Sequence, residues 1–147
     1  MRAERVLQFV DSNILICAYD VTAGAKHERA KALVAKLWET RDGCLSIQVL
    51  QEFYVTVTRK VARPLAADVA AEVVADLAAW RVHAPMVEDV NQAIAIHRRY
   101  AISFWDAMIV RSAAQLGCAT LWSEDLNAGQ VYEGVRIINP FAEPEKG

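Results

Sequence analysis

The sequence lacks an excess of basic residues. Its 16 Lys and Arg residues are outnumbered by 18 Asp and Glu residues, which gives a formal net charge of -2. Nucleic-acid-binding domains usually carry a basic patch or stripe. A global basic field is therefore excluded, and any contact with a nucleic acid must depend on local Lys and Arg clusters or on a bound metal ion.

Cysteine is also scarce. The three cysteines, Cys17, Cys44 and Cys118, are far apart and include no C-x-x-C pair. This number and spacing argue against a zinc cluster or a redox pair, and they fit a reducing cytosol. The histidines show no ligand spacing with one another, so we predict neither a zinc site nor histidine catalysis.

Long hydrophobic runs are missing as well. No segment reaches the roughly 18 uncharged apolar residues that a membrane span needs. The first apolar stretch follows charged residues and is broken by Asp11, so it makes a poor signal peptide. We therefore predict a cytoplasmic protein with no membrane association.

What the chain does contain is apolar periodicity. Its 147 residues, 54% of them hydrophobic, suit a single domain spanning residues 1–147 with its own core. Short β-rich apolar segments alternate with amphipathic helical segments, which predicts an α/β fold with a parallel sheet covered on both faces. We expect strands at 6–10, 44–47, 81–84, 119–122 and 135–138. We expect helices at 12–19, at 25–41 with Gly43 as a left-handed cap, directly after 47, from Pro64, at about 88–99, and from Ser103 to Gly117.

Four acidic residues are placed where these elements meet. Asp11 ends the first strand, and Asp125 follows the strand at 119–122. Glu52 and Asp106 lie in the early turns of two helices. Because ligands of open parallel sheets bind beyond the carboxyl ends of the strands, all four carboxylates are expected to converge on one pocket.

A cluster of carboxylates repels itself unless protons or cations neutralise it. Ligands that are all oxygen select hard ions such as Mg²⁺, Mn²⁺ or Ca²⁺. A hard ion with open positions for water and phosphate is the usual apparatus of phosphodiester hydrolysis. The four acids therefore indicate a metal-dependent nuclease.

Each acid also has a structural interpretation. Ser103 and Asp106 have the spacing of a capping box, and Asp125 fits a turn at 123–129. Glu52 is harder to explain in this way, because it lies beside the apolar stripe of its helix, where an unpaired Glu is costly.

Further polar and aromatic residues have two interpretations each. Ser12 and Asn13 follow the first acid and either contact substrate or cap a helix. Arg59 and Lys60 either bind RNA phosphates or form a solvated helix end. Trp105 either stacks on a base, or packs in the core or supports the neighbouring Asp106, and we favour the second interpretation.

The motifs that carry these acids resemble those of the PIN domain family, and within it the VapC-type toxins. The resemblance rests on four segments: FVDSNILICAYD, SIQVLQEFYVTVTRK, ISFWDAMIVRSA, and LWSEDLNAGQ followed by VRIINPF. In order, they place Asp11, Glu52, Asp106 and Asp125 at the family's metal-binding positions.

The resemblance implies a three-layer α/β/α sandwich with a small parallel sheet. It also implies Mg²⁺- or Mn²⁺-dependent endonucleolytic cleavage of RNA that leaves a 3′-hydroxyl and a 5′-phosphate. VapC-type toxins usually form homodimers and are inhibited by a cognate antitoxin protein. The fourth acid varies in such enzymes, so Glu124 or Asn127 is a candidate to share the role of Asp125.

Two other functions compete with the nuclease. A haloacid-dehalogenase-type phosphatase needs a second Asp two residues after the first, where this chain has Asn13. A non-catalytic RNA-binding module on a decayed PIN-like fold should have lost one or more acids, and none is missing. Metal-dependent turnover of RNA distinguishes this last alternative from the nuclease.

Overall fold

The computed structural model describes residues 5–142, and within this range six strands form one sheet in the order β3-β2-β1-β4-β6-β5. The first five strands in this order pair in parallel, and β5 pairs antiparallel with β6. The strands are β1 (Gln8–Val10), β2 (Gly43–Ser46), β3 (Arg81–His83), β4 (Thr120–Trp122), β5 (Val131–Tyr132) and β6 (Val135–Ile138). The parallel sheet was predicted, but β5 was not, because two residues carry no recognisable period.

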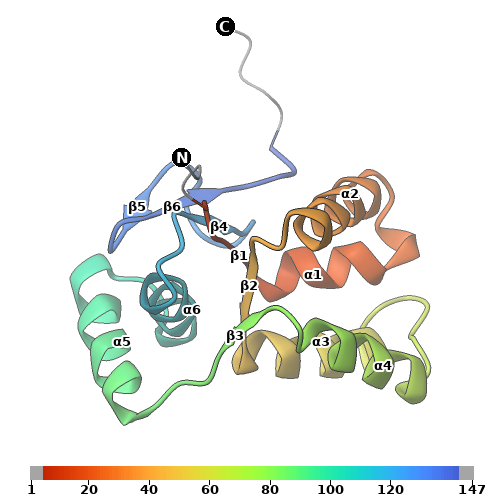
Figure 1. Ribbon diagram of the computed structural model, residues 1–147, viewed down its shortest axis with the longest axis horizontal. Helices are drawn as coiled ribbons and strands as arrows, with labels where there is room; N and C mark the ends of the chain where they lie inside the picture. Colours follow the sequence, from red (N-terminus) through yellow and green to blue (C-terminus); the bar gives the residue numbers. More distant parts are fainter. Residues whose placement is uncertain (1–4, 143–147) are drawn as a thin grey trace, which may run out of the picture.

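Helices cover the sheet on both sides, as Figure 1 shows. The helices α1 to α4 lie on one side, and α5 and α6 lie on the other. Their bounds are α1 (Ser12–Tyr19), α2 (Ala25–Thr40), α3 (Ile47–Arg59), α4 (Ala67–Leu77), α5 (Val87–Tyr100) and α6 (Phe104–Gln115), and a 3-10 turn spans Val21–Ala23. The predicted three-layer α/β/α arrangement is confirmed.

The core consists of the apolar side chains of the strands and the inner faces of the helices. Phe9, Leu45, Leu121 and Ile137, one from each of four parallel strands, are fully buried. A parallel sheet covered on both faces buries its strands in this way. The strands β1, β2 and β4 run side by side in the same direction, so their carboxyl ends share one edge of the sheet.

Two predicted helix signals are wrong. Pro64 does not open a helix, because the backbone N–H of Leu65 donates to the carbonyl of Val57 and α4 begins only at Ala67. Gly43 does not cap α2, since it lies in β2 and the left-handed residue is Arg41, with φ of 62°. A Cβ on Gly43 would lie 2.5 Å from the ring of Trp80, so this glycine is needed for packing.

The predicted bounds of several strands also need correction. The strand expected at 6–10 begins at Gln8, and the one expected at 44–47 ends at Ser46. The hydroxyl of Ser46 accepts a hydrogen bond from the backbone N–H of Val49 at 3.3 Å, which makes Ser46 the N-cap of α3. The chain therefore passes from β2 to α3 without a loop, and Glu52 lies in the second turn of this helix.

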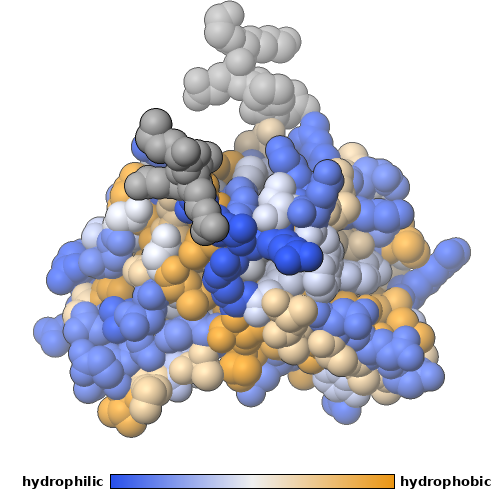
Figure 2. Space-filling model, viewed as in Figure 1, coloured by the Kyte–Doolittle hydropathy of each residue, from blue (hydrophilic) through white to orange (hydrophobic). Residues whose placement is uncertain are grey.

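The surface is mixed in polarity. In Figure 2, hydrophilic residues gather over α5 at the left of the view, with apolar residues scattered between them. This matches the amphipathic pattern of α5, whose buried residues are Asp89, Ala93 and Ile96. Within residues 5–142, no helix has both the length and the apolar character that crossing a bilayer requires.

Candidate active site

The four predicted acids all lie at the carboxyl edge of the sheet or in helices that start there. Asp11 directly follows β1 and is the N-cap of α1. Glu52 is in α3, Asp106 is in the first turn of α6, and Asp125 is in the turn after β4. Strand direction and helix start, read from the sequence, therefore placed all four correctly.

Asp11 is the deepest of the four, with 3% of its surface exposed. Its Oδ1 accepts from the backbone N–H of Ser12 at 2.7 Å, and its Oδ2 accepts from the hydroxyl of Ser123 at 2.7 Å. Burial raises the pKa of Asp11 to about 7, the two hydrogen bonds oppose this shift, and the charges of Asp125 and Glu52 add to it. The carboxylate is thus held in place without a cation to balance it.

Glu52 lies beside the buried stripe of α3 but is itself exposed, so the expected cost of burying an unpaired Glu does not arise. Its two oxygens are nevertheless fixed. Oε2 accepts from the hydroxyl of Ser12 at 2.7 Å, and Oε1 accepts from Nε2 of Gln48 at 2.8 Å. Gln48 also donates to the backbone carbonyl of Trp105 at 3.3 Å. Hydrogen bonds therefore connect α1, α3 and α6 around this acid.

The structure shows the capping contact of Asp106, while its role as a metal ligand stays a prediction. Its backbone N–H donates to the hydroxyl of Ser103 at 3.0 Å, so half of the predicted capping box is present. Its carboxylate has a pKa raised by partial burial and by the charges of Asp125 and Glu52, while Ser103 lowers it. Capping uses the backbone of Asp106 and leaves its side chain beside the other acids.

Two of the four acids raise the pKa of the other two. Asp125 and Glu52 raise the pKa of both Asp11 and Asp106, although the four residues come from four different elements. Repulsion of this kind requires that the side chains lie within a few ångströms to about one Debye length of each other. The acids therefore lie in the same part of the fold, and their convergence on one metal-binding pocket stays a prediction.

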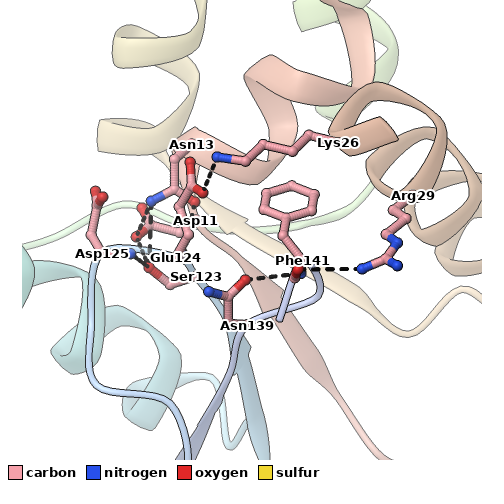
Figure 3. Close-up of polar contacts among 9 residues, drawn as sticks. All are labelled: Asp11, Asn13, Lys26, Arg29, Ser123, Glu124, Asp125, Asn139 and Phe141. Atoms are coloured by element: carbon pink, nitrogen blue, oxygen red, sulfur yellow. Dashed lines mark hydrogen bonds and ion pairs between the residues drawn. The ribbon is translucent and has the colours of Figure 1, made fainter. Parts of the chain in front are cut away.

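Glu124 and Asn127 differ from Asp125 in their surroundings. Oε2 of Glu124 forms an ion pair with Nζ of Lys26 at 2.8 Å, which turns this carboxylate toward α2 (Figure 3). Asn127 is exposed, and its backbone carbonyl accepts from Gln130. Asp125 is the one of these three residues whose charge raises the pKa of both Asp11 and Asp106.

A divalent cation fits the donor chemistry of this region. Within residues 5–142, no three His, Cys, Asp or Glu side chains are arranged so that they could already hold a metal ion. Carboxylates with no cation between them lower their energy by separating or by taking up a proton. The donors are all oxygen, which suits Mg²⁺ or Mn²⁺ rather than zinc.

Ser12 and Asn13 both contact the acids. The N-cap of α1 is Asp11, so capping does not explain either residue. The amide of Asn13 donates to Oδ2 of Asp11 and to the hydroxyl of Ser123, each at 3.4 Å. Ser123 and Gln48 were missed by the sequence analysis, although a serine directly after a strand that runs beside β1 was a usable signal.

The remaining candidates lie farther out. Arg59 and Lys60 are exposed at the C-terminal end of α3, roughly 10 Å along the helix axis from Glu52. Trp105 is 66% exposed, so the interpretation that it packs in the core is wrong. An aromatic face next to Asp106 is thus open to solvent.

Comparison with known proteins relates this chain to a protein family and to solved structures. The sequence matches the PIN domain family over residues 9–134. The comparison with curated proteins gave no match. Among solved structures, VapC20 of Mycobacterium tuberculosis, a toxin that cleaves the sarcin-ricin loop, is similar with a TM-score of 0.57 and 21% identity, over 79% of this chain and 88% of that one.

A toxin–antitoxin complex from Klebsiella pneumoniae is similar with a TM-score of 0.66 and 18% identity, over 91% of this chain and 98% of the matching one. At these identities the likeness to solved structures establishes the fold, and the family match covers most of the chain. The chain belongs to the PIN domain family.

Proposed function

We propose that this chain is a divalent-metal-dependent endoribonuclease and the toxin of a toxin–antitoxin pair. The main support is Asp11, a buried carboxylate with a raised pKa that shares its surroundings with three other acids. A buried charge without a partner is costly unless a cation or a proton compensates it. A cation that binds beside Asp11 best explains why the fold keeps a buried carboxylate at this free-energy cost.

The ligands of this cation are Asp11, Glu52, Asp106 and Asp125. Hydroxyl groups keep two of these carboxylates in place, since Ser123 donates to Asp11 and Ser12 donates to Glu52. Fixed ligands favour binding because little side-chain entropy remains to be lost when the ion arrives. Mutating these serines should therefore weaken metal binding without removing a ligand.

The reaction is hydrolysis of an RNA phosphodiester bond. A bound Mg²⁺ or Mn²⁺ would lower the pKa of the attacking water and offset the charge that grows on the phosphate. The water oxygen bonds to phosphorus, the bond to O3′ breaks, and O3′ takes up a proton, so the products carry a 5′-phosphate and a 3′-hydroxyl. Ser12 and Asn13 lie beside Asp11 and Glu52, where they can also donate to the phosphate.

RNA cleavage tests this function directly. Purified protein should cleave total RNA or tRNA in Mg²⁺ or Mn²⁺, and excess EDTA should stop the reaction. A non-catalytic RNA-binding module would bind the same RNA and leave it intact under all conditions. Cleavage that continues in excess EDTA would contradict the metal mechanism.

The toxin role is supported by the fold shared with VapC20 and with the Klebsiella pneumoniae toxin–antitoxin complex. Expression without an antitoxin partner should arrest bacterial growth, and Asp11→Asn should abolish the arrest at equal soluble protein. Equal growth of the two strains would refute the toxin role, and it would leave the nuclease activity to be judged by the cleavage assay.

RNA as substrate also implies a cytoplasmic location, and residues 1–147 are proposed to act as a single nuclease domain. A homodimer is proposed as well, because Trp38 of α2, Val69 of α4 and Val21 of the 3-10 turn after α1 leave apolar surface exposed. Trp80 is buried against Gly43 and adds nothing to this surface. A monomer mass in light scattering at micromolar concentration would refute the dimer.

A further inference from the structure

The first turns of α2 and the segment that follows β6 meet beside the acids, where Lys26, Arg29 and Phe141 lie together (Figure 3). We propose that these three residues form a nucleotide subsite that binds one RNA phosphate and stacks one unpaired base. This subsite rests on the proposed function, since it holds the substrate of the same active site. Its ligand class is single-stranded or looped RNA, because a base in a duplex cannot leave its stack to meet an aromatic ring.

Phe141 is held by polar contacts of its backbone. Its N–H donates to Oδ1 of Asn139 at 2.9 Å, and its carbonyl accepts from Nη1 of Arg29 at 3.3 Å. The residue packs against the hydrophobic core and is only partly buried. The fold therefore fixes the position of an aromatic face while leaving part of it open to solvent, which is what a stacking platform requires.

Lys26 reaches over this ring. Its Nζ lies 5.4 Å from the centre of the Phe141 ring and 2.8 Å from Oε2 of Glu124, and its side chain is 51% exposed. An exposed ion pair of this kind contributes at most about 1 kcal/mol. A phosphate can therefore replace Glu124 as the partner of Lys26 at little cost, with the ammonium group still over one face of the Phe141 ring and the other face left for a base.

A short series of contacts connects this subsite to the acids. The backbone N–H of Glu124 donates to Oδ1 of Asn13 at 3.4 Å, and the amide of Asn13 donates to Asp11 at 3.4 Å. Only the side chain of Asn13 and the residue Glu124 thus separate Lys26 from Asp11. A phosphate bound by Lys26 belongs to a nucleotide close to the one that is cleaved.

The charge of the chain makes such a subsite necessary. With a net charge of -2 and four acids at the reaction site, the protein repels the RNA backbone except near cations. Arg59 and Lys60, the cations expected from the sequence, lie at the far end of α3. Lys26 and Arg29 both lie in α2, and Lys26 contacts Glu124, the residue before Asp125. These two cations are therefore better placed to position RNA at the acids.

Binding of a fluorescent single-stranded RNA, measured by anisotropy in EDTA in an Asp106→Asn background, tests the phosphate contact without cleavage. Lys26→Ala should raise Kd about tenfold and reduce the slope of log Kd against log salt by about 1. Lys36→Ala removes the same charge from the same helix about three turns farther along, and it should change Kd less than twofold.

The base contact needs a second pair of variants. Phe141→Leu should raise Kd for normal RNA about tenfold, whereas Phe141→Tyr, which keeps the ring, should stay within about twofold of the parent. An RNA with an abasic residue at the stacked position should bind Phe141→Leu and the parent equally. When Lys26→Ala is the sole substitution, so that Asp106 is intact, it should raise KM for RNA cleavage in Mn²⁺ and leave kcat within about twofold.

Two outcomes would overturn the subsite alone. The first is equal RNA affinity of Lys26→Ala and Lys36→Ala. The second is an equal loss of affinity by Phe141→Leu for normal and abasic RNA, which would assign Phe141 to packing alone. Wild-type protein that cleaves RNA in these cases keeps the proposed function intact. Wild-type protein that neither binds nor cleaves RNA would end both proposals.

Discussion

Two buried aspartates of this chain have opposite surroundings. Asp11 is 3% exposed and Asp89 is 5% exposed, so both carboxylates are almost completely removed from water. The pKa of Asp11 is raised to about 7 by burial, whereas the pKa of Asp89 is lowered, chiefly by the hydrogen bond from the backbone N–H of Met86. Similar exposure thus goes with opposite shifts, because burial is the largest cause at Asp11 and the hydrogen bond from Met86 is the largest cause at Asp89.

The two carboxylates also differ in their partners. Asp89 accepts from the N–H of Met86 and from Nε of Arg111, each at 2.8 Å, and Nε2 of His83 lies 3.3 Å from it. The other ring nitrogen of His83 lies 2.8 Å from the hydroxyl of Ser112. This set joins β3, α5 and α6 and provides its own positive charge.

Asp11 has hydroxyl, amide and backbone donors, and the charges that act on it come from other acids. Asp89 has the cation Arg111 as a partner. Among residues 5–142, no Lys or Arg forms an ion pair or hydrogen bond with Asp11, which is consistent with the cation proposed to bind there. Buried carboxylates that a fold does not neutralise are therefore better guides to function than acidic residues in general.

The largest expected difference between the two regions is catalytic. Asp106→Asn should lower RNA cleavage in Mn²⁺ at least about a hundredfold, because it removes charge from the group that holds the cation at the phosphate. Asp89→Asn, at a temperature where it stays folded, should change cleavage less than about threefold. Initial rates on the same tRNA substrate measure both. A strong loss in Asp89→Asn alone would reverse the assignment of the two regions.

The second difference is in the free energy of unfolding of metal-free protein. Asp89→Asn should lower it by about 3 kcal/mol, since Arg111 loses its buried partner. Asp11→Asn should leave it unchanged or raise it, since a carboxylate in a repelling group is removed. Urea unfolding in EDTA at pH 7.5 gives both values. Equal destabilisation by the two variants would mean that Asp11 is also a structural residue.

The third difference concerns pH. A carboxyl group whose pKa rises from 3.8 to about 7 on folding favours the folded state at low pH, and this contribution is lost as the pH rises toward 7. Between pH 5.5 and 8, Asp11 should therefore reduce the stability of the metal-free protein by about 2 kcal/mol. Melting curves in EDTA should show this decline for wild type and a smaller one for Asp11→Asn. A decline of the same size in both proteins would show that other groups cause it.

The smallest difference separates Asp125 from Glu124. Mn²⁺ should raise the melting temperature of wild type by mass action on the folded state. Asp125→Asn should reduce this stabilisation by about 1.4 kcal/mol, which corresponds to a tenfold weaker affinity. Glu124→Gln should keep the full Mn²⁺ effect and bind RNA more tightly, because it releases Lys26. If Glu124→Gln loses the Mn²⁺ effect instead, Glu124 is the fourth ligand.

The sequence was sufficient to place the acids, because strand direction alone determines where the residues after β1 and β4 lie. It could not reveal the pairing of Asp89 with Arg111, which depends on how α5 packs against α6. The same holds for Lys26, whose partner Glu124 is distant in sequence and adjacent only in the fold. Gly43 was misassigned for a related reason. A glycine is required there because the ring of Trp80, which is distant in sequence, leaves no room for a side chain.

The antiparallel strand β5 has a consequence for how this protein can associate with others. Its residues Val131 and Tyr132 pair with β6 and so occupy one border of the sheet, while the opposite border is the short strand β3, followed closely by Pro85. Long unpaired strand borders invite strand exchange and fibrillar aggregation, and short ones followed by proline discourage both. Association with another chain should therefore use side-chain surfaces of the helices rather than an extension of the sheet.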